Sequence, residues 1–256
     1  MNLNGKIVFI TGASAGIGAA TAMQCAAQGA RLLLAARRAE KVAEVAEQAL
    51  QQGAAAVHSF ELDVRSREAV ADAIEALPPE WAEIDVLVNN AGLSRGMDKL
   101  YAGKIEDWEE MIDTNVKGLL YVSRAVVPGM VARGRGHVVT LGSMAGELVY
   151  PNGAVYCGSK AAARAINDGL REDLLGTPVR VTSVDPGLVE TEFSMVRFRG
   201  DADRAAGVYK GIKPLVAEDI ADVILWAITR PEHVNIARVS LTSVNQANTL
   251  LIHRDA

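Results

Sequence analysis

Short apolar runs alternate with longer amphipathic segments along the whole chain. The apolar runs are rich in Val, Leu and Ile, which is typical of strands buried on both faces of a parallel sheet. We expect about seven such strands, over residues 6–10, 31–36, 55–63, 84–92, 136–143, 179–187 and 237–244.

The segments between these runs carry apolar residues three and four positions apart, which predicts helices. The expected helices cover residues 16–29, 39–53, 67–77, 105–132, 154–175 and 217–230. Pro128 is expected to kink or shorten the helix that contains it. Residues 188–215 follow neither period, so we expect an irregular segment there.

Strands that alternate with helices this regularly predict the α/β class, as one Rossmann-type doubly wound parallel sheet over residues 1–256. No linker, low-complexity tract or internal repeat divides the series. Ligands of such folds bind beyond the carboxyl ends of the strands. The motifs that carry candidate chemistry fall at those ends or on the helices expected over residues 105–132 and 154–175.

Charge and composition exclude several classes of partner. The net charge of −5 gives no electrostatic reason to expect a nucleic acid. Two cysteines and four scattered histidines form no metal pattern. There is no signal-peptide pattern and no run of 18 apolar residues, so we expect no membrane partner and a cytoplasmic location.

A glycine-rich turn, TGASAGIG at residues 11–18, joins the first strand to the first helix. Gly12 suits the tight turn, while Gly16 and Gly18 let the backbone approach a pyrophosphate. Ser14 and Ile17 belong to the same turn. Free N–H groups at the start of a helix bind phosphate, so this turn predicts a dinucleotide site.

The end of the second strand indicates which dinucleotide binds. An acidic residue there would bind the ribose hydroxyls of NAD and repel a 2′-phosphate. Here Ala36 is followed by Arg37 and Arg38, and guanidinium groups bind phosphate through paired hydrogen bonds. The sequence therefore predicts NADP(H).

Tyr156 stands four positions before Lys160, so the two side chains share one face of a helix. A neighbouring ammonium stabilises the phenolate and lowers the pKa of a phenol from about 10. Such a phenol is a candidate proton donor near neutral pH.

Three more features follow in order: Asn89–Gly92 after a strand, Asn115 in the long helix, and Ser143 at a strand end. With the glycine turn and the tyrosine–lysine pair, they make the sequence resemble the short-chain dehydrogenase/reductase family from end to end. The resemblance implies that Tyr156 is the general acid or base, that Lys160 binds the nicotinamide ribose and lowers the pKa of Tyr156, and that Ser143 binds the carbonyl oxygen. It implies that Asn115 holds a water linked to Lys160.

The same resemblance implies the remaining cofactor contacts. The adenine would lie against Asp63 and Val64, and the central part of the cofactor against Asn89, Ala91 and Gly92. The nicotinamide end would contact Pro186, Gly187, Val189 and Thr191.

Within the family, the segments MIDTNVKGLLYVSRAVVPGMV and PGLVETEFSMVRFRGD look like those of NADP-dependent 3-hydroxy acid dehydrogenases. That subgroup implies serine, allo-threonine or 3-hydroxypropionate as substrate, and a homotetramer. Residues 188–215 are then the substrate-covering segment. Arg95, Leu148 and Arg197 are candidate substrate contacts, and Arg199 is a further candidate for a substrate carboxylate.

The sequence leaves alternatives open because GELVYPNG, at residues 146–153, departs from the pattern usual in the subgroup. The alternative within the enzyme class is a reductase whose substrate is a bulkier ketone, an aldehyde or a sulfonated aldehyde. Two other classes remain as rivals: a protein that senses NADPH without turnover, and a structural protein assembled through its helices.

Overall fold

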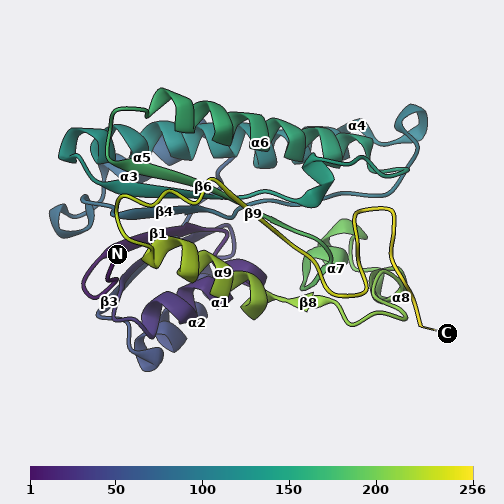
Figure 1. The fold of residues 1–256 in the computed structure, drawn as a ribbon, viewed down its shortest axis with the longest axis horizontal. Coiled ribbons are helices and arrows are strands. Elements are labelled where there is room, and N and C mark those ends of the chain that lie inside the picture. Colours follow the sequence, from purple (N-terminus) through teal and green to yellow (C-terminus); the bar gives the residue numbers. More distant parts are fainter. Residues whose placement is uncertain (256) are drawn as a thin grey trace.

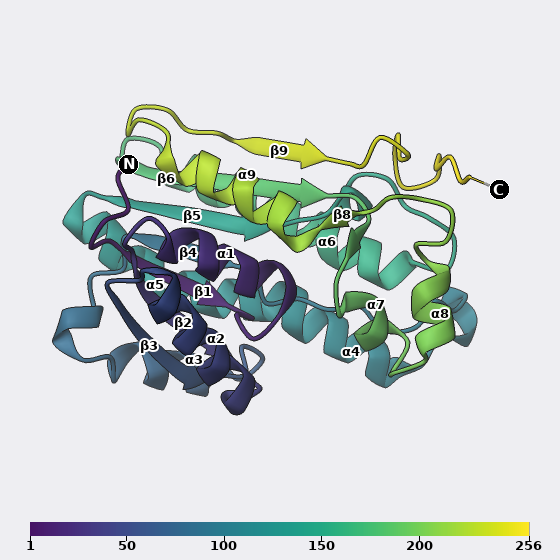
Figure 2. The same cartoon turned by 90° about the horizontal axis from the view of Figure 1, so that it is seen from below.

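Seven parallel strands form the central sheet of the computed structural model, which describes residues 1–255 (Figures 1 and 2). The strand order is β3-β2-β1-β4-β5-β6-β9, so the chain builds the sheet outward in both directions from β1 and β4. The strands are β1 (Ile7–Thr11), β2 (Arg31–Ala36), β3 (Ala56–Glu61), β4 (Val86–Asn89), β5 (Gly136–Leu141), β6 (Val179–Pro186) and β9 (Arg238–Leu241). The predicted Rossmann-type sheet is confirmed.

Helices cover both faces of the sheet (Figure 1). One face carries α1 (Gly16–Ala26), α2 (Ala39–Gln52) and α9 (Ala217–Thr229). The other carries α3 (Arg67–Glu75), α4 (Ile105–Ile112), α5 (Leu119–Arg133) and α6 (Ala154–Asp173). No helix within residues 1–255 has both the length and the apolar character needed to cross a bilayer.

Strand side chains alternate between two apolar cores. Val8 and Ile10 belong to the core under α1, α2 and α9, whereas Phe9 and Leu33 belong to the core under α5. All four side chains are fully buried. Burial on both faces explains why inner strands such as β1 and β2 read as nearly unbroken apolar runs, whereas the edge strands β3 and β9 are less buried and carry polar residues.

The long helix predicted over residues 105–132 is interrupted by one π-helical turn, Asp113–Gly118, between α4 and α5. Pro128 does not shorten it, because α5 continues to Arg133. Such turns displace a side chain from the regular helical spiral and occur often at functional sites. Asn115 lies within this turn.

Residues 188–215 are more regular than the sequence predicts. They contain α7 (Phe193–Arg197), α8 (Ala202–Gly207) and the strand β7 (Val189–Glu190), which pairs with β8 (Leu215–Val216). Elements this short carry too few turns or alternations to produce a periodic pattern. The carboxyl ends of the main strands point toward α7 and α8 (Figure 2).

Candidate active site

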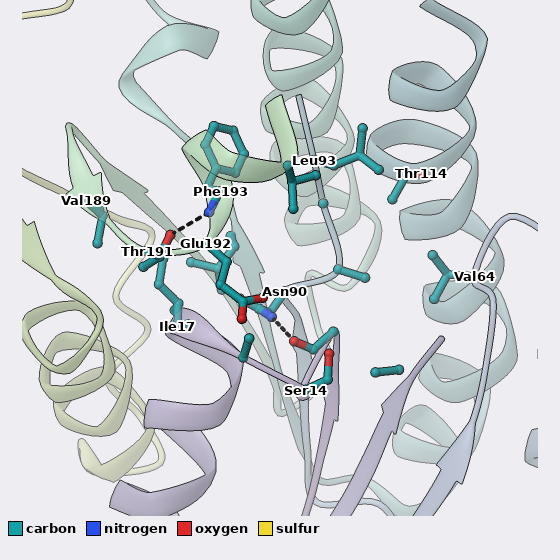
Figure 3. A pocket seen from close by; sticks show the side chains of 18 of the residues that line it. Ser14, Ile17, Val64, Asn90, Leu93, Thr114, Val189, Thr191, Glu192 and Phe193 are labelled. Carbon is teal, nitrogen blue, oxygen red and sulfur yellow. Dashed lines mark hydrogen bonds between the residues drawn. The ribbon is translucent and has the colours of Figure 1, made fainter. Parts of the chain in front are cut away.

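A cavity of about 390 Å³ opens where the strands end, between the glycine turn and the segment that leads into α7 (Figure 3). Most of the predicted cofactor contacts line it. They are Gly12, Ser14, Gly16, Ile17, Arg37, Arg38, Asp63, Val64, Ala91, Gly92, Pro186, Gly187, Val189 and Thr191.

The glycine turn packs against the turn after β4 too closely for any side chain. Gly12 has a φ of +66°, and a Cβ atom there would lie 2.9 Å from the Cα of Ala91. A Cβ atom on Gly18 would lie 2.5 Å from Nδ2 of Asn90. That amide donates hydrogen bonds to the carbonyl oxygens of Thr11 (2.9 Å) and Gly12 (3.0 Å). Gly18 does not line the cavity. Its lack of a side chain instead lets the glycine turn pack against Asn90.

Three candidate catalytic side chains meet at the inner end of the cavity. Tyr156 and Lys160 extend from the first turns of α6, and Ser143 stands just beyond β5. Tyr156 and Lys160 are both buried. The ammonium of Lys160 donates to the carbonyl oxygen of Leu141 at 2.8 Å, which holds the lysine between α6 and β5.

Burial raises the pKa of the Tyr156 phenol, and the charge of Arg197 together with a hydrogen bond to Ser143 opposes that rise. The sequence assigned the acidifying charge to Lys160, but in the structure the cation acting on the phenol is Arg197. Burial lowers the pKa of Lys160 to about 8, with Asp185 acting in the opposite direction.

The buried Asn115 lies in the π-helical turn and binds the loop after β4. Its Nδ2 donates to the Leu93 carbonyl (2.8 Å) and to Oγ of Ser159 (2.9 Å), and its Oδ1 accepts from the Leu93 N–H (2.8 Å). Asn115 does not line the main cavity. It borders a second cavity of about 10 Å³, which Lys160 also lines. That is about the space that one water molecule occupies.

The three arginines that are candidates for binding a substrate carboxylate differ in whether the protein already pairs them with one of its own carboxylates. Arg95 is already paired, because its Nε and Nη2 donate to the Glu110 carboxylate at 2.6 and 3.0 Å. Arg199 pairs with Asp107. Only Arg197 has no carboxylate partner among residues 1–255.

Arg197 lies beside the phenol of Tyr156. Its side chain is buried, and its guanidinium carbon is 5.2 Å from the centre of the Tyr156 ring. Its Nη2 donates to the Tyr150 hydroxyl at 3.0 Å, whereas its Nε has no partner among the described residues. A buried cation with unused hydrogen-bonding capacity is a candidate anion-binding group.

The arginines after β2 occupy the outer part of the cavity. Arg38 donates to Oγ of Ser14 at 3.1 Å and to a Glu192 carboxylate oxygen at 2.8 Å. Arg37 lies 3.5 Å from the Glu110 carboxylate. In Figure 3, Glu192 extends from the start of α7 toward the turn that carries Ser14.

Five of the predicted site residues do not line the main cavity: Gly18, Asn89, Asn115, Leu148 and Arg197. Leu148 is 38% exposed and does not line it. Asn89 is buried beneath it and donates to Oγ of Ser123 at 3.1 Å.

Asp63, in contrast, lines the cavity and forms an ion pair with Arg65. It does not cap α3, because the N-cap residue of that helix is Ser66.

Sequence reasoning missed four residues that shape this site: Glu110, Tyr150, Glu192 and Phe193. Glu192 is 154 positions from Arg38, so no local pattern relates the two. The Phe193 ring packs against Tyr156 at 5.6 Å, edge to face. Tyr150 lies in the segment 146–153, which departs from the subgroup pattern, but nothing in the sequence indicates that its hydroxyl accepts a hydrogen bond from Arg197.

The doubly wound sheet, with a tyrosine, a lysine and a serine gathered at its carboxyl edge, defines the class as an α/β oxidoreductase of Rossmann type. The model of the short chain dehydrogenase family matches residues 6–202. The chain belongs to this family, which confirms the resemblance read from the sequence.

Two curated relatives are similar over almost their whole length. The NADP-dependent 3-hydroxy acid dehydrogenase YdfG of Salmonella typhi is 44% identical over 97% of this chain and 99% of its own. The NADP-dependent 3-hydroxy acid dehydrogenase of Schizosaccharomyces pombe is 44% identical over 98% of each chain. A solved structure of serine dehydrogenase with NADP+, in a closed form, has a TM-score of 0.91 at 44% identity and covers 97% of this chain and 99% of its own.

Proposed function

We propose that the protein is an NADP(H)-dependent oxidoreductase that interconverts a small 3-hydroxy acid and its 3-oxo acid or semialdehyde. The observation that carries this proposal is the group formed by Tyr156, Ser143 and Lys160, with the guanidinium of Arg197 beside Tyr156. That guanidinium has no carboxylate partner among residues 1–255. The names of the relatives, which include 3-hydroxy acid and serine dehydrogenases, support the same reaction.

The cavity fits NADP(H) in shape and in charge. Gly12 and Gly16 leave room for a pyrophosphate against backbone N–H groups, and Arg37 and Arg38 supply cations for a 2′-phosphate. When bound, the cofactor supplies or accepts the hydride. The adenine would lie by Asp63 and Val64. The rest of the cofactor would follow Asn90, Ala91 and Gly92, which line the cavity, to the nicotinamide contacts Pro186, Gly187, Val189 and Thr191.

The phenol of Tyr156 gives its proton to the substrate oxygen during reduction and takes one back during oxidation. The Ser143 hydroxyl donates a hydrogen bond to the same oxygen as negative charge develops on it. Lys160 and Asn115 both line the small cavity and hold a water there, through which a proton returns to the Tyr156 phenol after reduction. A lysine with a pKa of about 8 exchanges protons readily near neutral pH.

Arg197 binds the substrate carboxylate. Arg95 lines the cavity, but its guanidinium is bonded to Glu110. Arg197 does not itself line the cavity, but it lies against the Tyr156 ring, which does, and it has no carboxylate partner among residues 1–255. A guanidinium beside Tyr156 orients a substrate whose anionic group is one or two carbons from the reacting carbon. Residues 188–215, which carry Arg197, cover the substrate. A sulfonated aldehyde is the second candidate, because a guanidinium also binds sulfonate.

The decisive experiment measures turnover of NADP+ with serine, allo-threonine and 3-hydroxypropionate, and of NADPH with a sulfonated aldehyde and neutral ketones of several sizes. We expect the hydroxy acids to have the highest kcat/KM. The Tyr156→Phe variant should lose about 10²- to 10⁴-fold in kcat while still binding NADPH. Unchanged turnover in that variant refutes the mechanism, and NADPH binding without turnover of any substrate favours the sensing protein.

We also propose that the protein is a cytoplasmic homotetramer. The proposal rests on the subgroup resemblance and on the near-complete coverage of the relatives. Sedimentation at several protein concentrations tests the assembly: a single species of four subunits supports it, and a monomer or dimer contradicts it. Fractionation of the source cells tests the location.

A further inference from the structure

The carboxylate of Glu192, in the segment 188–215, forms ion pairs with Arg38 and Lys41, close to the end of β2. Glu192 directly precedes α7, and its two oxygens are 2.8 Å from Nη1 of Arg38 and 3.6 Å from Nζ of Lys41. Arg38 also donates to Ser14 in the glycine turn. The contact therefore joins the covering segment to the turn and to the end of β2.

The Glu192 carboxylate is ionised at neutral pH. Partial burial raises its pKa, but the hydrogen bond and charge of Arg38 and the charge of Lys41 outweigh that effect and hold the pKa below its usual range. Arg37 lies similarly near Glu110. The cations available for a 2′-phosphate are thus partly neutralised by the protein itself.

We propose that the Glu192 carboxylate competes with the 2′-phosphate of NADP(H) for Arg38 and Lys41, and so sets how strongly the protein selects NADP(H) over NAD(H). The proposal rests on the proposed function, which assigns this end of the cavity to the adenosine ribose. Glu192 is then a specificity-determining residue contributed by the segment that covers the substrate.

The balance of charge explains why the two anions exclude each other. A phosphate group carries about −1.5 to −2 charges at neutral pH, which Arg38 and Lys41 together neutralise. A carboxylate left on the same two cations would repel the phosphate across a few ångströms. The phosphate displaces the carboxylate because the ion pair is weak: the side chains of Glu192, Arg38 and Lys41 are 46%, 44% and 49% exposed.

The experiment measures binding of two cofactor fragments by calorimetry, so that it does not depend on activity. Adenosine 2′,5′-bisphosphate carries the 2′-phosphate, and adenosine 5′-monophosphate lacks it. The variant is Glu192→Gln, which removes the charge at constant size. Glu190→Gln is the matched control, because Glu190 lies two residues away on β7 and has no ion pair among residues 1–255.

We expect Glu192→Gln to tighten binding of the bisphosphate by about fivefold, which is the size of a half-exposed ion pair, and to leave the monophosphate unchanged. Glu192→Ala should act in the same direction, and Glu190→Gln should change neither affinity. Equal bisphosphate affinity in wild type and Glu192→Gln overturns the proposal. Weaker affinity also overturns it, since Glu192 would then support the bound cofactor instead of competing with it.

The wild-type protein separates this proposal from the proposed function. If wild type binds neither the bisphosphate nor NADPH, the proposed function fails. If it binds both, and Glu192→Gln changes neither the bisphosphate affinity nor the ratio of NADPH to NADH affinity, only the competition fails.

Discussion

The guanidinium of Arg197 lies 5.2 Å from the centre of the Tyr156 ring, and within residues 1–255 no carboxylate balances its charge. A buried cation without a counter-ion lowers the stability of a fold, so its presence calls for a functional reason. Here one charge performs two tasks. It opposes the rise in the pKa of the Tyr156 phenol, and in the proposed function it binds the substrate carboxylate.

Replacing Arg197 by Gln should impair both tasks. Loss of a charged hydrogen-bond partner should raise KM for a hydroxy acid about 10- to 100-fold. Loss of the positive charge raises the pKa of Tyr156, so the alkaline rise of kcat/KM for alcohol oxidation should move to higher pH. Steady-state kinetics between pH 6 and 10 measures both effects, with the upper limit set by enzyme stability.

The matched control is Arg199→Gln, because Arg199 pairs with Asp107 and does not contact Tyr156. It should leave the pH profile in place. If Arg197→Gln keeps the wild-type KM for hydroxy acids, another group binds the carboxylate.

The two arginines after β2 should determine the choice of cofactor. Arg37→Asp introduces a carboxylate that repels a 2′-phosphate, and Arg38→Ala removes the guanidinium bonded to Ser14. Each change should lower the ratio of kcat/KM with NADP+ to that with NAD+ by about 10- to 100-fold. A variant that keeps the wild-type ratio excludes its arginine as a phosphate contact.

Much of the fold and part of the site were predictable because their signals are local. Inner strands such as β1 and β2 appear as apolar runs because both of their faces are buried. The tyrosine–lysine pair is recognisable by its spacing of about one helical turn. The pairing of Glu192 with Arg38 has no such signal. It exists because the sheet order and the path of residues 188–215 bring two distant segments together. The orientation of Arg197 toward Tyr156 was equally hidden, since α7 has only five residues.

Lys160 should destabilise the cofactor-free protein at neutral pH. Burial lowers its pKa from 10.5 to about 8, so keeping the lysine charged costs the folded state about 3 kcal/mol relative to the unfolded state. Lys160→Met removes that penalty and also the hydrogen bond to Leu141, worth about 1 kcal/mol. The variant should therefore unfold with a free energy about 2 kcal/mol higher at pH 7, although it loses activity.

The lowered pKa of Lys160 also determines how the stability difference between wild type and Lys160→Met changes with pH. Below pH 8 the lysine is charged in both states and the penalty is complete. Between pH 8 and 10.5 the unfolded state binds more protons, so wild type gains stability as pH rises and the advantage of Lys160→Met fades. Urea unfolding at several pH values measures the difference. A variant less stable than wild type at pH 7 contradicts the lowered pKa.

Gly18 should tolerate no side chain, because the turn after β1 and the turn after β4 meet at its Cα. A Cβ atom there would lie 2.5 Å from both Nδ2 of Asn90 and the carbonyl oxygen of Gly12, which is backbone and cannot move aside. Gly18→Ala should lower the free energy of unfolding by about 1–3 kcal/mol and disturb the hydrogen bonds of Asn90 to the glycine turn.

Gly169→Ala provides the contrast, because Gly169 lies within α6 and an added Cβ meets no atom within 4 Å. Alanine restricts the unfolded chain and favours the helix, so this variant should gain about 0.5–1 kcal/mol. Urea unfolding of the two variants then gives changes of opposite sign for the same chemical substitution. If Gly18→Ala is as stable as wild type and binds NADPH with unchanged affinity, close approach of the two turns is not what requires glycine at this position.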